Sequence, residues 1–233
     1  MSKIPLILIP GLLCDDALWA PQTKWLSDIA DIAVGETQID DCFSAMAERI
    51  LETAPRHFAL AGLSMGGYVC MEIMRQAPER IERLALFDTS GRADTADQTK
   101  RRKALIELAT IGKFKGVTPR LLPLLIHKDR QSDKELTNAV IEMAGRVGQA
   151  GFLRQQTAIM NRPDRQAEMA MYDLPTMVVC GRQDALTPLD LHEEMAELIP
   201  HARLCLIEEC GHLSTLEQPH AATDLMRDWL LRN

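Results

Sequence analysis

Short apolar runs alternate along the chain with longer stretches in which apolar residues recur at helical spacing. Leu6–Ile9 is nearly continuous in its apolar character, as expected of a strand buried on both faces of a parallel sheet. Phe43–Thr53 instead gathers its apolar residues on one side of a helix. Such alternation implies a mostly parallel sheet with helices on both faces. The pattern predicts strands at residues 6–9, 29–34, 57–61, 83–87, 175–180 and 203–207, and helices at 15–28, 43–53, 65–76, 189–198 and 214–231.

The last of these helices has a polar start signal. Ser214-Thr-Leu-Glu217 resembles a capping box, in which a serine side chain and a glutamate three residues later satisfy the first free N–H groups. We therefore expect one continuous helix from Ser214 to Leu231.

Residues 92–170, which we name the cap segment, interrupt the alternation with helical periodicity and little strand signal. Residues 92–165 hold 15 basic and 8 acidic side chains, a net charge of +7, whereas the rest of the chain has 11 and 25. These charges fit either solvated helix faces or a helical cap whose basic residues face an anionic substrate. The chain thus divides into a first core part (1–91), a cap (92–170) and a second core part (171–233).

Composition places the chain among ordinary globular proteins. Its 233 residues suffice for one sizeable α/β domain, and 46% apolar and 25% charged residues are typical of such domains. A net charge of −7 argues against a general nucleic-acid binder. Six cysteines lack metal-ligand spacing, which favours reduced, buried thiols: Cys14, Cys42, Cys70, Cys180, Cys205 and Cys210.

The apolar amino-terminal segment, Ile4–Leu13, predicts neither a signal peptide nor a membrane span. Pro5, Pro10 and Gly11 interrupt it, it is too short to cross a bilayer, and no small-residue cleavage site follows. We expect a cytoplasmic protein that does not associate with a membrane.

Gly62-Leu-Ser64-Met-Gly66 carries the strongest chemical signal, because a strand pattern precedes it and a helix pattern follows. A serine on such a sharp turn exposes its Oγ above the sheet, and the glycines relieve the crowding of a tight turn. The N–H of the next residue, Met65, points into the same site and can stabilise an oxyanion.

A serine nucleophile needs a base and an acid. His212 lies in a loop between the last predicted strand and the last predicted helix, at the sheet edge where ligands bind in open α/β folds. Asp184 follows another strand end, which gives the order Ser64, Asp184, His212. Asp88 also follows a strand and competes for the role of acid. The remaining histidines are at positions 57, 127, 192, 201 and 220, of which His57 is expected inside a strand.

The second oxyanion donor is expected in the loop after the first strand. There the chain reads Ile9-Pro10-Gly11-Leu12, and the N–H of Leu12 is the candidate.

Four motifs together resemble the α/β-hydrolase superfamily, over about residues 1–90 and 172–233. They are Ala61-Gly-Leu-Ser-Met-Gly-Gly67, Gln76-Ala-Pro-Glu-Arg-Ile81, Gly181-Arg-Gln-Asp184 and Gly211-His212 with Glu217-Gln-Pro219. Small bacterial enol-lactonases, carboxylesterases and cofactor-free haloperoxidases are most similar. The resemblance implies Ser64 as nucleophile, His212 as base, Asp184 as acid, and the N–H groups of Leu12 and Met65 as oxyanion hole.

Two departures from the family pattern qualify the resemblance. Pro10-Gly11 stands where many members have His-Gly, and the chain begins directly with the strand before the oxyanion loop. We therefore expect about six strands rather than eight.

The expected function is hydrolysis of an ester, lactone or thioester of a small molecule through an acyl-enzyme, and a basic cap that faces the site would suit an anionic substrate. The alternatives are a C–C bond hydrolase, perhydrolase or lyase on the same fold, or a non-catalytic ligand-binding receptor. No cofactor and no metal are implied, no nucleic-acid partner is expected, and the chain is expected to act as a monomer or homodimer.

Overall fold

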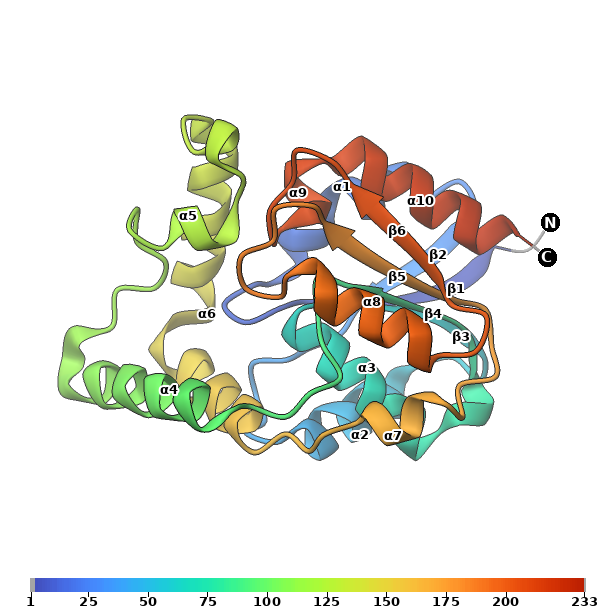
Figure 1. Ribbon diagram of the computed structural model, residues 1–233, viewed down its shortest axis with the longest axis horizontal. Coiled ribbons are helices and arrows are strands. Elements are labelled where there is room, and N and C mark those ends of the chain that lie inside the picture. The colour runs from blue at the N-terminus through green and yellow to red at the C-terminus, as the bar shows by residue number, and fades with distance from the viewer. Residues whose placement is uncertain (1–2, 233) are drawn as a thin grey trace.

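Six parallel strands form a single sheet in the computed structural model, which describes residues 3–232 (Figure 1). Their spatial order is β2-β1-β3-β4-β5-β6. The expected sheet of about six parallel strands is therefore confirmed. The strands are β1 (Ile4–Ile9), β2 (Ala30–Val34), β3 (Phe58–Leu63), β4 (Ile81–Phe87), β5 (Thr176–Gly181) and β6 (Arg203–Ile207).

Helices cover both faces of this sheet because the strands are apolar on both sides. On one face, Leu6, Leu8 and Phe87 share a core with α10 (Pro219–Leu231). The short helix α1 (Ala20–Trp25) packs against α10. The opposite face carries α2, α3 and α8, with Ile7 and Ile9 in the second core. The bounds of the latter three helices are Phe43–Thr53, Met65–Gln76 and Leu189–Leu198.

The strand order reverses beside β1, and this reversal positions the candidate site. The chain goes from β1 to β2 on one side, then returns to β3 on the other, with Ile9 of β1 opposite Gly62 of β3. Ligands of open α/β sheets bind at the carboxyl ends of strands at such a reversal. The loops after β1 and β3, which hold Leu12 and Ser64, are therefore neighbours.

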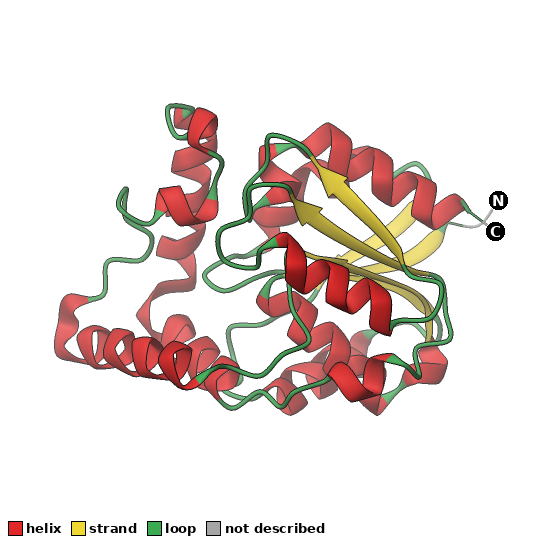
Figure 2. Cartoon of the chain, viewed as in Figure 1, coloured by secondary structure: helices red, strands yellow, loops and turns green. Residues whose placement is uncertain are grey.

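The cap segment leaves the core after β4 and returns before β5. Figure 2 shows helices and loops in it and no strand, and all of residues 92–170 are described. Its longest helix, α6, has a kink at Gly148, where φ is +66°. The cap helices are α4 (Ala96–Leu108), α5 (Leu122–Leu125), α6 (Lys134–Met160) and α7 (Gln166–Met169), with a π-helical turn at Ala109–Lys113 and a 3-10 turn at Lys128–Arg130.

Two of the expected helices are wrong in their extent. The helix expected over 15–28 is a 3-10 turn at Asp16–Trp19 followed by the short α1. The helix expected over 214–231 is broken into α9 (Ser214–Glu217) and α10. Pro219 causes the second break, since a proline disfavours helical backbone at the residue before it and has no N–H to donate.

The expected capping box at Ser214 is also wrong. The residue that precedes α9 is Leu213, and the Ser214 hydroxyl donates to Asp88, while no side-chain oxygen accepts from a helix N–H as a capping box requires. His57 precedes β3 and is exposed, so it does not lie inside the strand.

All six cysteines are free thiols, and all except Cys42 are buried. None of the helices within residues 3–232 is both long and apolar enough to cross a membrane.

Candidate active site

Ser64 lies on a strained turn between β3 and α3. Its φ is +56° and ψ is −117°, and its N–H donates to the Phe87 carbonyl at 2.9 Å. A non-glycine residue adopts positive φ at a cost, so surrounding contacts must hold it there. A Cβ on Gly62 would lie 2.4 Å from the Gly66 carbonyl oxygen, and a Cβ on Gly66 would lie 2.2 Å from that of Ile9. The turn therefore requires glycine on both sides of the serine.

The side chains of Ser64, His212 and Asp184 form one continuous hydrogen-bonded chain. Oγ of Ser64 is 2.9 Å from Nε2 of His212, and Nδ1 of His212 is 2.8 Å from Oδ2 of Asp184. Thr187 further holds the acid, because its hydroxyl donates to Asp184 Oδ2 at 2.7 Å and its N–H donates to Oδ1 at 3.0 Å. The sequence analysis did not single out Thr187.

The electrostatic surroundings of Asp184 and His212 favour a histidine that can accept a proton. Burial opposes ionisation of Asp184, but His212 and the Thr187 hydrogen bonds hold the pKa of this carboxyl below its usual range. Burial would lower the pKa of His212, yet the Asp184 carboxylate outweighs it and raises that pKa. An ionised Asp184 carboxylate can only accept a hydrogen bond, so Nδ1 of the neutral His212 ring carries the proton and donates to it. Nε2 of His212 then presents its lone pair to the Ser64 hydroxyl.

Asp88, the competing acid, is fully buried and has other partners. Its Oδ1 accepts from the Gly181 N–H at 2.8 Å, and its Oδ2 accepts from the Ser214 hydroxyl. Burial and the nearby Asp184 raise its pKa well above the usual range. The described hydrogen bonds of His212 reach Asp184 and not Asp88. Asp88 thus connects the last residue of β5 to the first residue of α9.

Glu217 holds the backbone of the loop that carries His212. Its buried carboxylate accepts from the N–H of Gly211 at 3.0 Å, of Leu213 at 3.3 Å and of the cap residue His127 at 2.6 Å. The glutamate stood in the histidine-loop motif, but a motif does not reveal which backbone groups a carboxylate meets. The cap also contributes directly, since the N–H groups of His212 and Leu213 donate to the Leu125 carbonyl.

The two candidate oxyanion donors are the N–H of Leu12, in the loop after β1, and the N–H of Met65, at the first residue of α3. A Cβ on Gly11 would be 3.2 Å from the Leu63 carbonyl oxygen, which shows how closely the loop after β1 approaches the turn at Ser64. Within residues 3–232, no hydrogen bond uses the N–H of Leu12 or of Met65. Two neighbouring free N–H groups are what an oxyanion hole requires.

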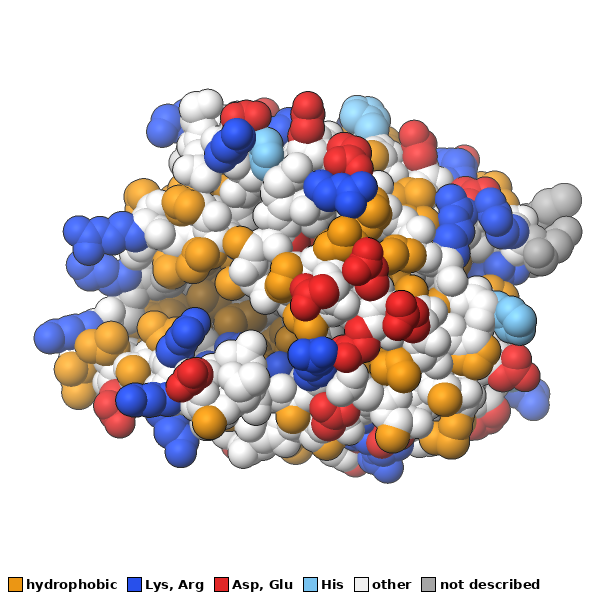
Figure 3. All heavy atoms as spheres, viewed as in Figure 1, with side chains coloured by type: hydrophobic (Ala, Val, Ile, Leu, Met, Phe, Trp, Pro, Cys, Tyr) orange, Lys and Arg blue, Asp and Glu red, His pale blue; other side chains and the backbone are white. Residues whose placement is uncertain are grey.

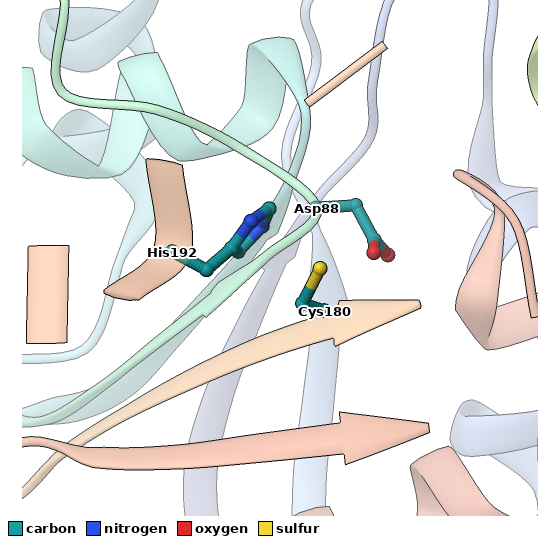
Figure 4. Close-up of side chains that lie close together, drawn as sticks. All are labelled: Asp88, Cys180 and His192. Atoms are coloured by element: carbon teal, nitrogen blue, oxygen red, sulfur yellow. The ribbon is translucent and has the colours of Figure 1, made fainter. Parts of the chain in front are cut away.

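Asp88, Cys180 and His192 offer ligand atoms within 4.8 Å of one another (Figure 4). Both ring nitrogens of His192 are nevertheless engaged, since Nε2 accepts from the Thr89 N–H at 3.1 Å and Nδ1 lies 3.2 Å from the Pro188 carbonyl. Burial lowers the pKa of His192 and raises that of the Cys180 thiol, so both stay uncharged. These contacts account for the proximity of the three side chains by packing and hydrogen bonding, without a metal ion.

The other histidines of the sequence lie outside this group. His57, His201 and His220 are exposed, and His127 is buried.

The cap lies over the side of the core to which the amino end of α3 points (Figure 1). Figure 3 shows a hollow between cap and core, with hydrophobic side chains on its visible walls and Lys and Arg side chains near its edge. Several cap arginines hold the two parts together through ion pairs. These are Arg92 with Glu194, Arg146 with Asp15 and Arg165 with Glu72, while Arg102 and Arg162 both pair with Asp94 inside the cap.

The family model described as alpha/beta hydrolase fold matches residues 34–219. The chain belongs to the α/β-hydrolase family. A pimeloyl-[acyl-carrier protein] methyl ester esterase of Nitrosomonas europaea is 25% identical to this hydrolase over 77% of the chain and 73% of the relative.

Solved structures agree with this assignment. A thermophilic esterase from Thermogutta terrifontis has a TM-score of 0.88 at 26% identity and covers 98% of this chain and 90% of its own. The enol-lactonase from Burkholderia xenovorans has the same fold, with a TM-score of 0.88 at 20% identity over 99% of this chain and 92% of its own. The chain is thus an enzyme of the hydrolase type.

Proposed function

We propose that this hydrolase cleaves a carboxylic ester, lactone or thioester of a small molecule through an acyl-enzyme on Ser64. The continuous hydrogen-bonded chain from Ser64 through His212 to Asp184 carries the proposal. A hydroxyl becomes a useful nucleophile when an oriented base takes its proton, and this arrangement supplies both the base and its orientation.

The reaction follows from that geometry. Oγ of Ser64 attacks the substrate carbonyl carbon while its proton passes to Nε2 of His212. The N–H groups of Leu12 and Met65 donate to the oxygen that becomes negative. His212 then returns the proton to the leaving alkoxide or thiolate, and Asp184 stabilises the imidazolium meanwhile. Water, deprotonated by His212, finally attacks the acyl carbon and releases the acid and Ser64.

The cap supports a substrate that has an apolar part and a negative charge. Large exposed apolar side chains are concentrated on it, at Leu105, Leu108, Ile111, Leu121 and Leu124. Exposed basic side chains occur in the same stretch, and no ion pair among the described residues includes them: Lys100, Arg101, Lys103, Lys113, Lys115 and Arg120. The relative named above is a pimeloyl-[acyl-carrier protein] methyl ester esterase, which supports the ester part of the proposed substrate class.

Labelling with a fluorophosphonate probe, together with steady-state kinetics on p-nitrophenyl esters, tests the proposal. The wild type should form a phosphonyl adduct on Ser64, and Ser64→Ala should lose the adduct and at least about 10⁴-fold in kcat while it keeps its unfolding temperature. Wild-type activity in Ser64→Ala, or an absent adduct in the wild type, would show that Ser64 is not the nucleophile.

A matched pair of neutral and carboxylated p-nitrophenyl esters tests the anionic preference. We expect a higher kcat/KM for the carboxylated ester, with the difference shrinking at high salt because ions screen exposed charges. Equal values would remove the anionic substrate class. Turnover of a C–C bond or of acetate with hydrogen peroxide, without turnover of any ester, would assign one of the alternative reactions.

The burial of five of the six free thiols fits a reducing compartment, so we also propose a cytoplasmic location.

A further inference from the structure

Gln155 of α6 connects the cap to the loop that carries the proposed oxyanion donor Leu12. The side chain is completely buried, and its Oε1 accepts from the N–H of Leu13 at 3.0 Å across 142 positions of sequence. Its Nε2 donates to the carbonyl oxygen of Thr37 at 3.3 Å and to the Thr37 hydroxyl at 3.4 Å. One amide group therefore joins three segments at the carboxyl edge of the sheet.

Leu13 holds an unfavourable backbone conformation at this contact. The N–H of Cys14 donates to the Gly11 carbonyl at 3.2 Å, which closes a four-residue turn with Leu13 at its third position. The φ of Leu13 is +59°, as a type II turn requires at that position, where glycine is the usual residue. A leucine is disfavoured in this left-handed conformation, so other contacts must stabilise the turn.

The hydrogen bonds of the Gln155 amide favour this type II turn over a type I turn. The Thr37 carbonyl can only accept, so it binds Nε2 and leaves Oε1 facing Leu13. Oε1 can only accept as well, so it requires the Leu13 N–H to point toward it. Rotation of the Leu12–Leu13 peptide would give the common type I turn, but it would turn this N–H away and leave a buried oxygen unpaired.

We propose that Gln155 is a positioning residue for the oxyanion hole. By holding the Leu13 peptide, it keeps the turn in the form that leaves the adjacent Leu12 N–H free beside Ser64. This inference rests on the proposed acyl-transfer function, and it makes the cap part of the catalytic geometry as well as a cover over the site.

Gln156 provides a matched control on the same helix. It is also buried, at 2% exposure, but its Oε1 accepts from Nη1 of Arg102 within the cap at 2.8 Å. Gln155→Met and Gln156→Met each remove one buried amide and keep the side-chain length. Gln155 makes more hydrogen bonds than Gln156, so the structural loss of each variant is measured separately, as the change in unfolding temperature.

The experiment measures kcat and KM on a p-nitrophenyl ester, the dissociation constant of phenylboronic acid, and the unfolding temperature. For Gln155→Met we expect kcat to fall about 10- to 100-fold with KM within about threefold, because the oxyanion donor acts mainly in the transition state. Phenylboronic acid, whose adduct places an oxygen in the oxyanion hole, should bind more weakly by a similar factor. Gln156→Met should keep kcat and boronate affinity within about threefold.

Equal kcat values for the two variants, or an unchanged boronate affinity in Gln155→Met, would overturn the positioning role. Should Gln155→Met not fold, Gln155→Asn keeps the amide on a chain one methylene shorter and is expected to show the same separation of kcat from KM. A wild type that forms no fluorophosphonate adduct would instead refute the proposed function, whereas a normal adduct with unaffected Gln155 variants refutes only this inference.

Discussion

Nδ1 of His212 lies 2.8 Å from Oδ2 of Asp184, and both side chains are almost entirely buried. This contact opposes the effect of burial on His212, since the Asp184 carboxylate raises the pKa of the imidazole that burial would otherwise lower. Nε2 of His212 must carry no proton if it is to accept the proton of the Ser64 hydroxyl. Activity should therefore be lost as the pH falls through a pKa above the ordinary histidine value of about 6.5.

Asp184→Asn should lower kcat by about 10³- to 10⁴-fold, because the base loses both its tautomer and the charge that stabilises its imidazolium. The pKa of His212 should fall when the carboxylate is removed, so the acidic limb of the kcat/KM profile should move to lower pH. A pH profile of the residual activity measures this shift. A limb that stays in place would mean that Asp184 does not set the pKa of His212.

Asp88→Asn separates the two candidate acids. The asparagine can still accept from the Gly181 N–H and can donate to Ser214, the two partners of Asp88. We expect kcat within about tenfold of the wild type and a change in unfolding free energy of about 1 kcal/mol, as for an exchanged hydrogen bond. Steady-state kinetics and urea unfolding of this variant, beside Asp184→Asn, check it. A loss comparable to that of Asp184→Asn would assign the acid role to Asp88.

Glu217→Gln should loosen the histidine loop. An amide nitrogen would face at least one of the backbone N–H groups that the carboxylate now accepts, from His127 or from Gly211 and Leu213. A buried donor without an acceptor costs about 1–3 kcal/mol, so we expect a destabilisation of about 2 kcal/mol in urea unfolding and a lower kcat. Gln218→Ala, which removes neighbouring contacts to Glu208 and Glu209 carbonyls, should have a smaller effect on both. Equal effects would contradict a special role for Glu217.

Two glycine substitutions should change stability in opposite directions. Gly66→Ala would place a Cβ 2.2 Å from the Ile9 carbonyl oxygen, so β1 and the turn at Ser64 must move apart, with a loss of stability and of activity. Gly145→Ala, in the interior of α6, meets nothing within 4 Å and should stabilise the fold by about 0.5–1 kcal/mol. Thermal unfolding of both variants measures the difference, and a stable Gly66→Ala would contradict the close packing at the turn.

Local patterns in the sequence predicted the strands and most helices because those elements depend on spacing between near neighbours. These patterns gave wrong predictions where a proline interrupted a helix or where a side chain formed a hydrogen bond with a residue far away in the sequence. Pro219 ended one helical turn and began another, and the Ser214 hydroxyl formed a hydrogen bond with Asp88 instead of capping a helix. The preceding strand and helix patterns also placed Ser64, Asp184 and His212 at strand ends, without showing which atoms meet.

By itself, the sequence determined a parallel α/β sheet and the few chemically useful side chains at its carboxyl edge, because apolar periodicity and chain order specify both. Only the tertiary structure decided that Asp184 rather than Asp88 contacts His212, and that Gln155 of the cap holds the turn at Leu13. These contacts join residues 28 and 142 positions apart. Their partners are chosen by packing and hydrogen-bond directions that arise only when the segments meet, so no local pattern records them.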